Sequence, residues 1–201
     1  MILYGAGDHG KVIVEILEAN NIQDIVFWDD NPKGDLWEFK VSKSSTNIIV
    51  DKYMIISIGN NIIRKIIAEK TNKQFNFAKA IHPNSVISRR SVIGQGSVVM
   101  PGGIINANSI IGEHVIINSC AVVEHDCVLA DFIHISPNAS ICGNVSIGEG
   151  THVGAGAVII QGIKIGKWCT IGAGAVIIKD IPDYAVVVGN PGKIIKYNQS
   201  T

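Results

Sequence analysis

The sequence predicts two structural regions in one chain: an α/β, Rossmann-like half domain over residues 1–82 and an all-β parallel β-helix over residues 83–201. Two observations predict this division. A glycine-rich turn stands between a strand-like and a helix-like segment at the start of the chain, and a six-residue repeat fills most of the second region. The 201 residues are enough for one medium domain or two small ones.

The repeat begins at Ser85 and continues in blocks of six residues to position 180. A fixed period of six residues is typical of a parallel β-helix, in which three blocks form one coil. Residues two apart on a strand share a face, so block positions one and three are expected to point inward and position two outward. We interpret the frequent glycine at position four as the residue that permits the corner after each strand. The third position is aliphatic in all sixteen blocks: Ile87, Ile93, Val99, Ile105, Ile111, Ile117, Val123, Leu129, Ile135, Ile141, Ile147, Val153, Ile159, Ile165, Ile171 and Ile177.

The first region begins with "MILYGAGDHGKVIVEILEANNIQDIVFWDD", which predicts a strand, a glycine turn, an amphipathic helix and a second strand. The glycines match G-x-G-x-x-G, and Asp29 and Asp30 end the second strand. Amide groups at a helix start can approach a phosphate, and a carboxylate there can bind ribose hydroxyls. A further strand and turn ("YMIISIGNN"), a helix over Ile62–Lys70 and a short strand near Ala78–Ile81 follow.

Because only one half of a dinucleotide fold precedes the repeat, a mononucleotide portion is expected in the first region rather than NAD. The alternative is that the glycines only form a tight turn.

The composition excludes several classes of partner. Lysine plus arginine and aspartate plus glutamate each number 17, so neither a nucleic-acid nor an anionic-membrane surface is expected. There is no secretory signal and no apolar run near the roughly 20 residues of a membrane span, which predicts a cytoplasmic protein. The four cysteines lack C-x-x-C spacing, and each is expected to be reduced and packed in the interior. Cys127 could act as a nucleophile, but nothing in the sequence supplies an orienting partner.

A polar run, Glu124–Asp126, interrupts the aliphatic pattern. His125 occupies block position five, an outward-facing corner. A neighbouring carboxylate favours the protonated imidazole and fixes its tautomer, which suits a general base. The alternative is a solvated surface histidine.

Two further histidines, His134 and His152, both occupy position two and lie one coil apart, so they are expected to stack on one outward face. A stacked pair raises the possibility of a zinc site. However, His114 and His125 are offset from that column and no three-histidine set is evident, so no metal is expected.

Several motifs carry a family resemblance that spans nearly the whole chain: "YGAGDHGKV", "FWDDNP", "SIGNN", "VVEHDC", "FIHIS", "CGNVSIG" and "VVVGNPGKII". With them the chain resembles the PglD/NeuD-like family of bacterial nucleotide-sugar acetyltransferases with hexapeptide repeats. The resemblance implies a left-handed β-helix, acetyl-CoA as co-substrate, and a homotrimer with active sites between subunits.

The same resemblance implies roles for individual residues. His125 would be the general base and Asp126 the neighbour that raises its basicity. Gly143 would present its N–H to the thioester oxygen. The acetyl-CoA site would include His134, Gly143, Ala155 and Ala173. The nucleotide-sugar site would include Gly7, Asp8, His9, Asp29, Asp30 and Gly59. Asp8 is a departure, because relatives often carry a small residue there.

The expected function is direct acetyl transfer from acetyl-CoA to the amine of a nucleotide-linked aminodideoxy sugar, with UDP as the expected nucleotide. One alternative is O-acetylation of a sialic acid or another sugar, since the same base serves a hydroxyl group. A zinc-dependent hydrase and a nucleotide-responsive assembly partner are the alternatives outside acyl transfer.

Overall fold

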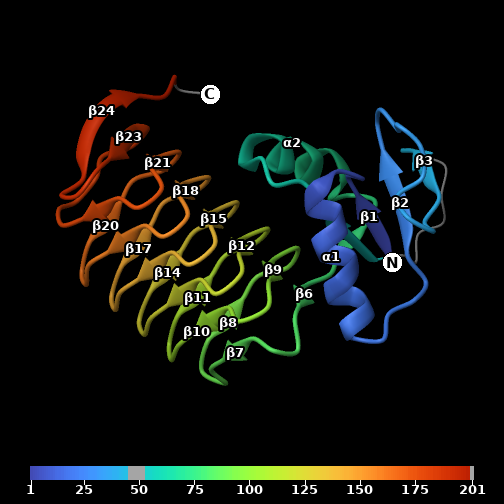
Figure 1. Ribbon diagram of the computed structural model, residues 1–201, viewed down its shortest axis with the longest axis horizontal. Helices are drawn as coiled ribbons and strands as arrows, with labels where there is room; N and C mark the ends of the chain where they lie inside the picture. The colour runs from blue at the N-terminus through green and yellow to red at the C-terminus, as the bar shows by residue number, and fades with distance from the viewer. Residues whose placement is uncertain (45–52, 200–201) are drawn as a thin grey trace.

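The computed structural model describes residues 1–44 and 53–199 and places the α/β region at one end of the β-helix (Figure 1). The α/β region contains a five-stranded parallel sheet of order β3-β2-β1-β4-β5. Its strands are β1 (Ile2–Tyr4), β2 (Val26–Asp29), β3 (Val41–Lys43), β4 (Tyr53–Ile56) and β5 (Asn76–Phe77). Helices α1 (Asp8–Ala19) and α2 (Asn61–Thr71) follow β1 and β4. Both predicted strand–turn–helix steps are therefore confirmed.

The glycine turn has the geometry that its spacing predicts. Gly5 has a φ of 114°, and Gly7 is the N-cap of α1. A Cβ added at Gly10 would lie 2.7 Å from the carbonyl oxygen of Gly5, so the helix approaches the strand closely only because this residue has no side chain. Ile13 and Leu17 on α1 are buried, which holds the amphipathic helix against the sheet.

The short strand predicted near Ala78–Ile81 is found at Ala80–Ile81, but it does not belong to the first sheet. Asn76–Phe77 pairs with β4 in the first sheet, whereas β6 (Ala80–Ile81) pairs with β9 (Val98–Val99) in the β-helix. The side chain of Ala80 belongs to a core formed jointly by α1 and the β-helix, so the first coil begins before the repeat is visible in the sequence.

The β-helix consists of three sheets. In each sheet, the short strand of one coil pairs in parallel with the equivalent strand of the next coil. The six-stranded sheet holds β7 (Val86–Ile87), β10 (Ile104–Ile105), β13 (Val122–Val123), β16 (Ser140–Ile141), β19 (Val158–Ile159) and β22 (Val176–Ile177). The five-stranded sheet holds β8 (Val92–Ile93), β11 (Ile110–Ile111), β14 (Val128–Leu129), β17 (Ser146–Ile147) and β20 (Lys164–Ile165). The eight-stranded sheet holds β6, β9, β12 (Ile116–Ile117), β15 (His134–Ile135), β18 (His152–Val153), β21 (Thr170–Ile171), β23 (Ala185–Val188) and β24 (Lys193–Tyr197).

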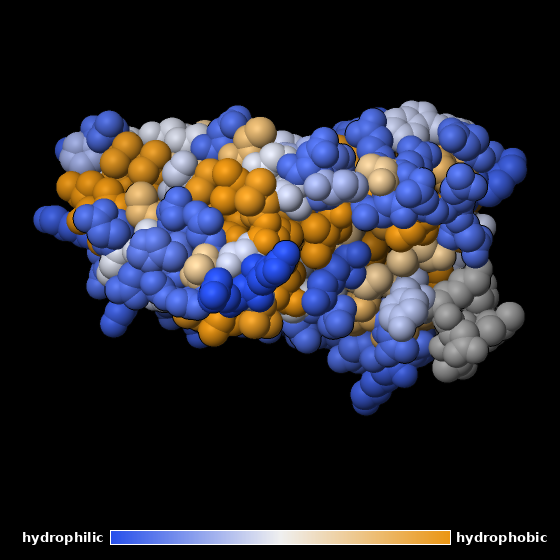
Figure 2. All heavy atoms as spheres, turned by 90° about the horizontal axis from the view of Figure 1, so that it is seen from below, coloured by the Kyte–Doolittle hydropathy of each residue, from blue (hydrophilic) through white to orange (hydrophobic). Residues whose placement is uncertain are grey.

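The predicted inward positions form the core. From Val99 to Ile177 every third-position side chain is buried, while Ile87 and Ile93 in the first coil are partly buried against the same core. Position-two side chains point outward, and several remain exposed at Val86, Val92, Ile110 and Val128. Hydrophobic side chains accordingly reach the surface of the β-helix half of the molecule in Figure 2. None of the helices within the described ranges has the length and apolar character needed to cross a membrane.

The structure assigns the glycines at position four a different role from the predicted one. The residue with positive φ at most corners is the sixth, as at Gly156 and Asp126. A Cβ added at position four would instead meet the backbone of the next coil, 2.5 Å from the Lys167 nitrogen for Gly148 and 2.6 Å from the Ala173 nitrogen for Gly154. Glycine at position four therefore allows successive coils to lie close together, rather than allowing the corner to turn.

The α/β region packs on the first strands of the eight-stranded sheet. Val98, Met100 and Ile116 of the β-helix share a buried cluster with Ile13 and Leu17 of α1. The later strands of the same face, from β15 onward, lie beside the N-terminus of α2 (Figure 1). We propose residues 1–82 and 83–201 as the two functional regions, with β6 at the end of the first already paired with the β-helix.

Candidate functional site

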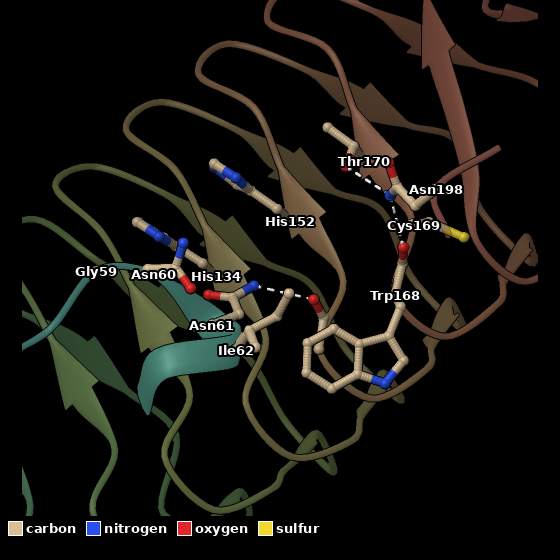
Figure 3. Close-up of a pocket in the computed structure, with 11 residues that line it drawn as sticks. Gly59, Asn60, Asn61, Ile62, His134, His152, Trp168, Cys169, Thr170 and Asn198 are labelled. Carbon is tan, nitrogen blue, oxygen red and sulfur yellow. Dashed lines mark hydrogen bonds between the residues drawn. The ribbon is translucent and has the colours of Figure 1, made fainter. Parts of the chain in front are cut away.

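A pocket of about 470 Å³ lies where α2 meets the eight-stranded face. Its floor is formed by outward side chains of β15, β18 and β21, and its walls by the start of α2 and by the C-terminal segment (Figure 3). The lining residues are Gly59, Asn60, Asn61, Ile62, His134, Gly150, His152, Trp168, Cys169, Thr170 and Asn198. Two predicted site residues, Gly59 from the nucleotide-sugar set and His134 from the acetyl-CoA set, are thus brought together.

The predicted stacking of His134 and His152 is confirmed. The two residues are register partners on β15 and β18, and their rings lie 4.9 Å apart at an interplanar angle of 9°. Asn118 Nδ2 lies 3.0 Å from His134 Nε2. Because an amide NH₂ group only donates, His134 Nε2 is the acceptor of this hydrogen bond. Burial, together with His152 and Arg64, lowers the pKa of His134 to about 3. Burial and then Arg64 also lower the pKa of His152, so both rings are neutral near pH 7.

The proposed base lies at a different part of the β-helix. His125 is an exposed corner residue between β13 and β14, and its Nδ1 is 2.8 Å from Asp126 Oδ2. Because an ionised carboxylate only accepts, this contact puts the hydrogen on Nδ1 and leaves Nε2 able to take a proton. Asn108, one coil earlier, donates from Nδ2 to Asp126 Oδ1 at 3.1 Å. The hydrogen bonds from His125 and then from Asn108 hold the pKa of the Asp126 carboxyl below its ordinary value.

Gly143 lies directly beside the His125 ring, one coil further along. A Cβ added at Gly143 would lie 2.6 Å from His125 Cε1 and 2.7 Å from Nε2. The space around the reactive nitrogen therefore exists because position 143 has no side chain. Within the described ranges no acceptor is found for the Gly143 N–H, which leaves this donor available next to Nε2.

Cys127 has the environment of a packing residue. Its side chain is fully buried, and its Sγ lies 3.2 Å from the carbonyl oxygen of Cys142. Burial is the main cause that raises the pKa of this thiol above its ordinary value, which disfavours the nucleophilic thiolate. Both observations disfavour a nucleophilic role for Cys127.

The candidate nucleotide residues lie along the carboxyl edge of the parallel sheet. A second pocket, of about 340 Å³, is lined by Gly7 and Asp29 among other residues. The Asp29 carboxylate accepts from the backbone N–H of Ala6 at 3.0 Å and of Asn31 at 2.8 Å, which fixes it beside the glycine turn. Asp30 points elsewhere, because its Oδ1 accepts from the Tyr4 hydroxyl at 2.7 Å.

Asp8 and His9, which the family resemblance assigns to the nucleotide-sugar site, lie in very different environments. Asp8 is almost fully exposed and pairs with Lys11 at 2.8 Å. His9 is largely buried at the seam between the two regions, with its ring centroid 6.5 Å from that of His134. Its Nε2 is buried without a partner among the described residues.

Ala155 and Ala173 lie on a third part of the β-helix surface. They occupy equivalent exposed corners between the eight-stranded and six-stranded sheets, one coil apart. His125 lies at the corner between the six-stranded and five-stranded sheets. In a triangular prism this corner is opposite the eight-stranded face, which carries His134. Within one chain the core of the β-helix therefore separates the His125 corner from the pocket.

The part of the chain described here contains no group of three or more His, Cys, Asp or Glu side chains arranged to hold a metal ion. The pocket also contains residues that sequence reasoning did not single out: Asn60, Asn61, Trp168, Thr170 and Asn198. The motif "SIGNN" contains the first two, and Asn60 is the N-cap of α2, with its side chain accepting from the Ile63 N–H at 3.0 Å. An asparagine before a helix-like segment was the signal that could have marked this wall.

The chain combines a Rossmann-like half domain with a β-helix of six-residue repeats that carries an exposed corner histidine. This is the architecture of a hexapeptide-repeat transferase. Comparisons with known proteins agree. Residues 1–71 match the PglD N-terminal domain, and residues 144–179 match the bacterial transferase hexapeptide (six repeats). The acetyltransferase domain of PglB from Neisseria gonorrhoeae, also solved in complex with acetyl coenzyme A, is 40% identical with a TM-score of 0.93. The alignment covers 96% of this chain and 98% of that one.

PerB from Caulobacter crescentus, solved in complex with CoA and GDP-perosamine, is 34% identical with a TM-score of 0.91, over 97% of this chain and 96% of that one. UDP-N-acetylbacillosamine N-acetyltransferase of Bacillus subtilis is 40% identical over 107 residues. That match covers 49% of this chain and spans 50% of the curated relative. The chain therefore belongs to the PglD-like family of nucleotide-sugar acetyltransferases, as its motifs predicted.

Proposed function

We propose that this protein transfers the acetyl group of acetyl-CoA to the amine of a nucleotide-linked aminodideoxy sugar, with UDP as the nucleotide. The observation that carries the proposal is His125, which is paired with Asp126 at an exposed corner of an otherwise aliphatic scaffold. Similarity over nearly the full chain to an acetyltransferase domain supports the reaction class. The relatives named for UDP-N-acetylbacillosamine and perosamine support an aminosugar acceptor.

The proposed mechanism is direct transfer. The sugar amine attacks the acetyl carbonyl carbon and His125 Nε2 removes a proton from the amine. The C–S bond then breaks to release the CoA thiolate, and the protonated His125 returns its proton to the sulfur. Asp126 accepts a hydrogen bond from the Nδ1–H of His125 and stabilises the imidazolium as it forms. The Gly143 N–H donates to the thioester oxygen as negative charge develops on it.

The substrates occupy two subsites in this proposal. The nucleotide-sugar lies along the carboxyl edge of the first sheet, in contact with Gly7–His9, Asp29, Asp30 and Gly59. Acetyl-CoA lies along the eight-stranded face and its corner, in contact with His134, Ala155 and Ala173. The 6.5 Å separation of the His9 and His134 rings supports adjacent subsites.

We also propose that the active protein is a homotrimer and cytoplasmic. The positions of the site residues favour an active site between copies, because within one chain His125 and the pocket lie on opposite sides of the β-helix. A neighbouring copy can bring its own His125 to this pocket. Exposed Val92, Ile110 and Val128 supply apolar surface for such a contact.

A thiol-release assay with acetyl-CoA and a panel of UDP-, GDP- and CMP-linked acceptors tests the function. Amine-dependent thiol release supports the proposal. Release only with hydroxyl acceptors would indicate an O-acetyltransferase, and tightly held zinc without acetyl-CoA binding would indicate the hydrase.

The same assay tests the base. His125→Ala is expected to lower turnover by about 10²–10⁴-fold, the usual contribution of general-base catalysis. The melting temperature should change little, because the His125 side chain is exposed. Turnover equal to that of the wild type would remove His125 from the mechanism.

A further inference from the structure

Arg64 on α2 is one of the largest fully buried side chains of the described residues, at 1% exposure. No carboxylate lies within ion-pair distance of it in the described ranges. Its hydrogen bonds go to six oxygen atoms, five of them backbone carbonyls. Burial lowers the pKa of the guanidinium to about 9, so the group is charged at neutral pH.

The first set of acceptors lies on the β-helix. Nε donates to the carbonyl of His114 at 2.9 Å, and Nη2 donates to that of Phe132 at 2.9 Å. His114 and Phe132 are equivalent corner residues one coil apart, with φ of 54° and 59°. Asn61 continues the series, since its Nδ2 donates to the carbonyl of Gly150, one coil further, at 3.0 Å. Arg64 and Asn61 therefore fix α2 along three successive coils.

The second set of acceptors lies in the turn that forms the pocket wall. Nη1 donates to the carbonyls of Ile58 and Gly59, both at 3.1 Å, and Nη2 donates to Asn61 Oδ1 at 2.9 Å. The same guanidinium thus joins the turn after β4 to the β-helix corner. Gly59 and Asn61 line the pocket opposite the stacked histidines, so this contact sets the position of one wall against the floor.

The chemistry favours a geometric role over a stabilising one. A buried charge costs a large desolvation free energy, and well-packed apolar residues at such sites are often as stable or more stable. What an apolar residue cannot do is orient five carbonyls from two regions at once. Lysine cannot do it either, because an ammonium group has three donors without the planar fork of arginine.

We propose that Arg64 is a positioning residue for ligand binding: it fixes the Gly59–Asn61 turn over the His134–His152 face and so presets the pocket. The inference rests on the proposed function for its kinetic test. It adds that affinity for the nucleotide-sugar depends on a residue that touches no ligand.

The test compares Arg64→Lys with Lys65→Met. Lys65 is the matched control because it too joins α2 to the β-helix, but its ammonium group pairs with Glu149 and lies over the rings of Phe132 and Trp168, not on the carbonyls of the Gly59 turn. Arg64→Lys should raise KM for the nucleotide-sugar about tenfold while kcat changes less than about threefold, the pattern of lost uniform binding. Lys65→Met should leave both values within about twofold, since such partly exposed ion pairs contribute little. An unchanged KM in folded Arg64→Lys would overturn the inference.

A measurement on the wild-type protein covers the case in which Arg64→Lys does not fold. Hydrogen exchange at the amides of Ile63 and Arg64, which bond to Asn60, should be slow before any ligand is added. Fast exchange that becomes slow only with nucleotide-sugar would show that the ligand, not Arg64, orders the turn. This readout is independent of turnover, so it can still overturn the inference if no acceptor is acetylated and the proposed function fails.

Discussion

At the residue scale, the imidazole of His125 has room only because the next residue in its column is glycine. Gly143→Ala should rotate the ring away, since a Cβ would approach Cε1 to 2.6 Å. The ring is exposed and free to move, so the melting temperature should change little while kcat falls by about 10²-fold, as expected for misplacement of about 1 Å. Ala107→Gly, one coil before His125 in the same column, is the control and should retain activity. Full activity of Gly143→Ala would contradict the proposed arrangement.

His125 could be predicted from the sequence because a polar run stands out against an aliphatic repeat. Arg64 could not, because five of its six acceptors are backbone carbonyls, as far as 69 residues away, which leave no mark on side-chain identity. The environment of His9 was equally hidden, since its burial depends on how the two regions pack.

At the scale of the coil, the period predicted the strands and the inward column, because burial selects an aliphatic residue at the third position of every six-residue block. It did not predict which corner position has positive φ. That position is occupied by His114, Cys120, Phe132 and Trp168 as well as by glycine, so residue type conceals the conformation. The tertiary context overrides the local preference for glycine or asparagine at these sites.

Two glycine substitutions separate close coil stacking from corner conformation. Gly148→Ala should reduce the free energy of unfolding by about 1–3 kcal/mol, because its Cβ would press on the backbone of the next coil. Gly162→Asn should cost only a few tenths of a kcal/mol, since its corner has open space and asparagine tolerates positive φ. Urea unfolding monitored by circular dichroism measures both. A larger loss of unfolding free energy for Gly162→Asn than for Gly148→Ala would contradict the stacking role assigned to the glycines at position four.

For the molecule as a whole, neutral histidines gathered at the seam between the two regions predict acid sensitivity. Burial and then Arg64 lower the pKa of both His9 and His114 to about 4. At pH values between the folded-state pKa of about 4 and the unfolded-state pKa near 6.5, the unfolded chain binds more protons than the folded protein. The free energy of unfolding should therefore fall as the pH falls from about 7 to 4. His114→Phe keeps a ring between Phe77 and Phe132 and should flatten the pH dependence measured by urea unfolding. An unchanged dependence of the free energy of unfolding on pH would exclude His114 as a contributor. His82→Gln, which changes a histidine other than the buried His9 and His114, is the control.

The assembly itself can be tested by mixing two inactive variants. His125→Ala lacks the base, and His152→Trp fills the pocket, so each homo-oligomer should be inactive if both features are needed. In mixed oligomers a His152→Trp copy can bring its intact His125 to the open pocket of a His125→Ala copy. Random mixing in a closed ring should then restore about a quarter of the sites. If base and pocket acted within one chain, no mixture could regain activity. Native mass spectrometry verifies the exchange of subunits, so inactivity of mixed oligomers would refute a site shared between copies.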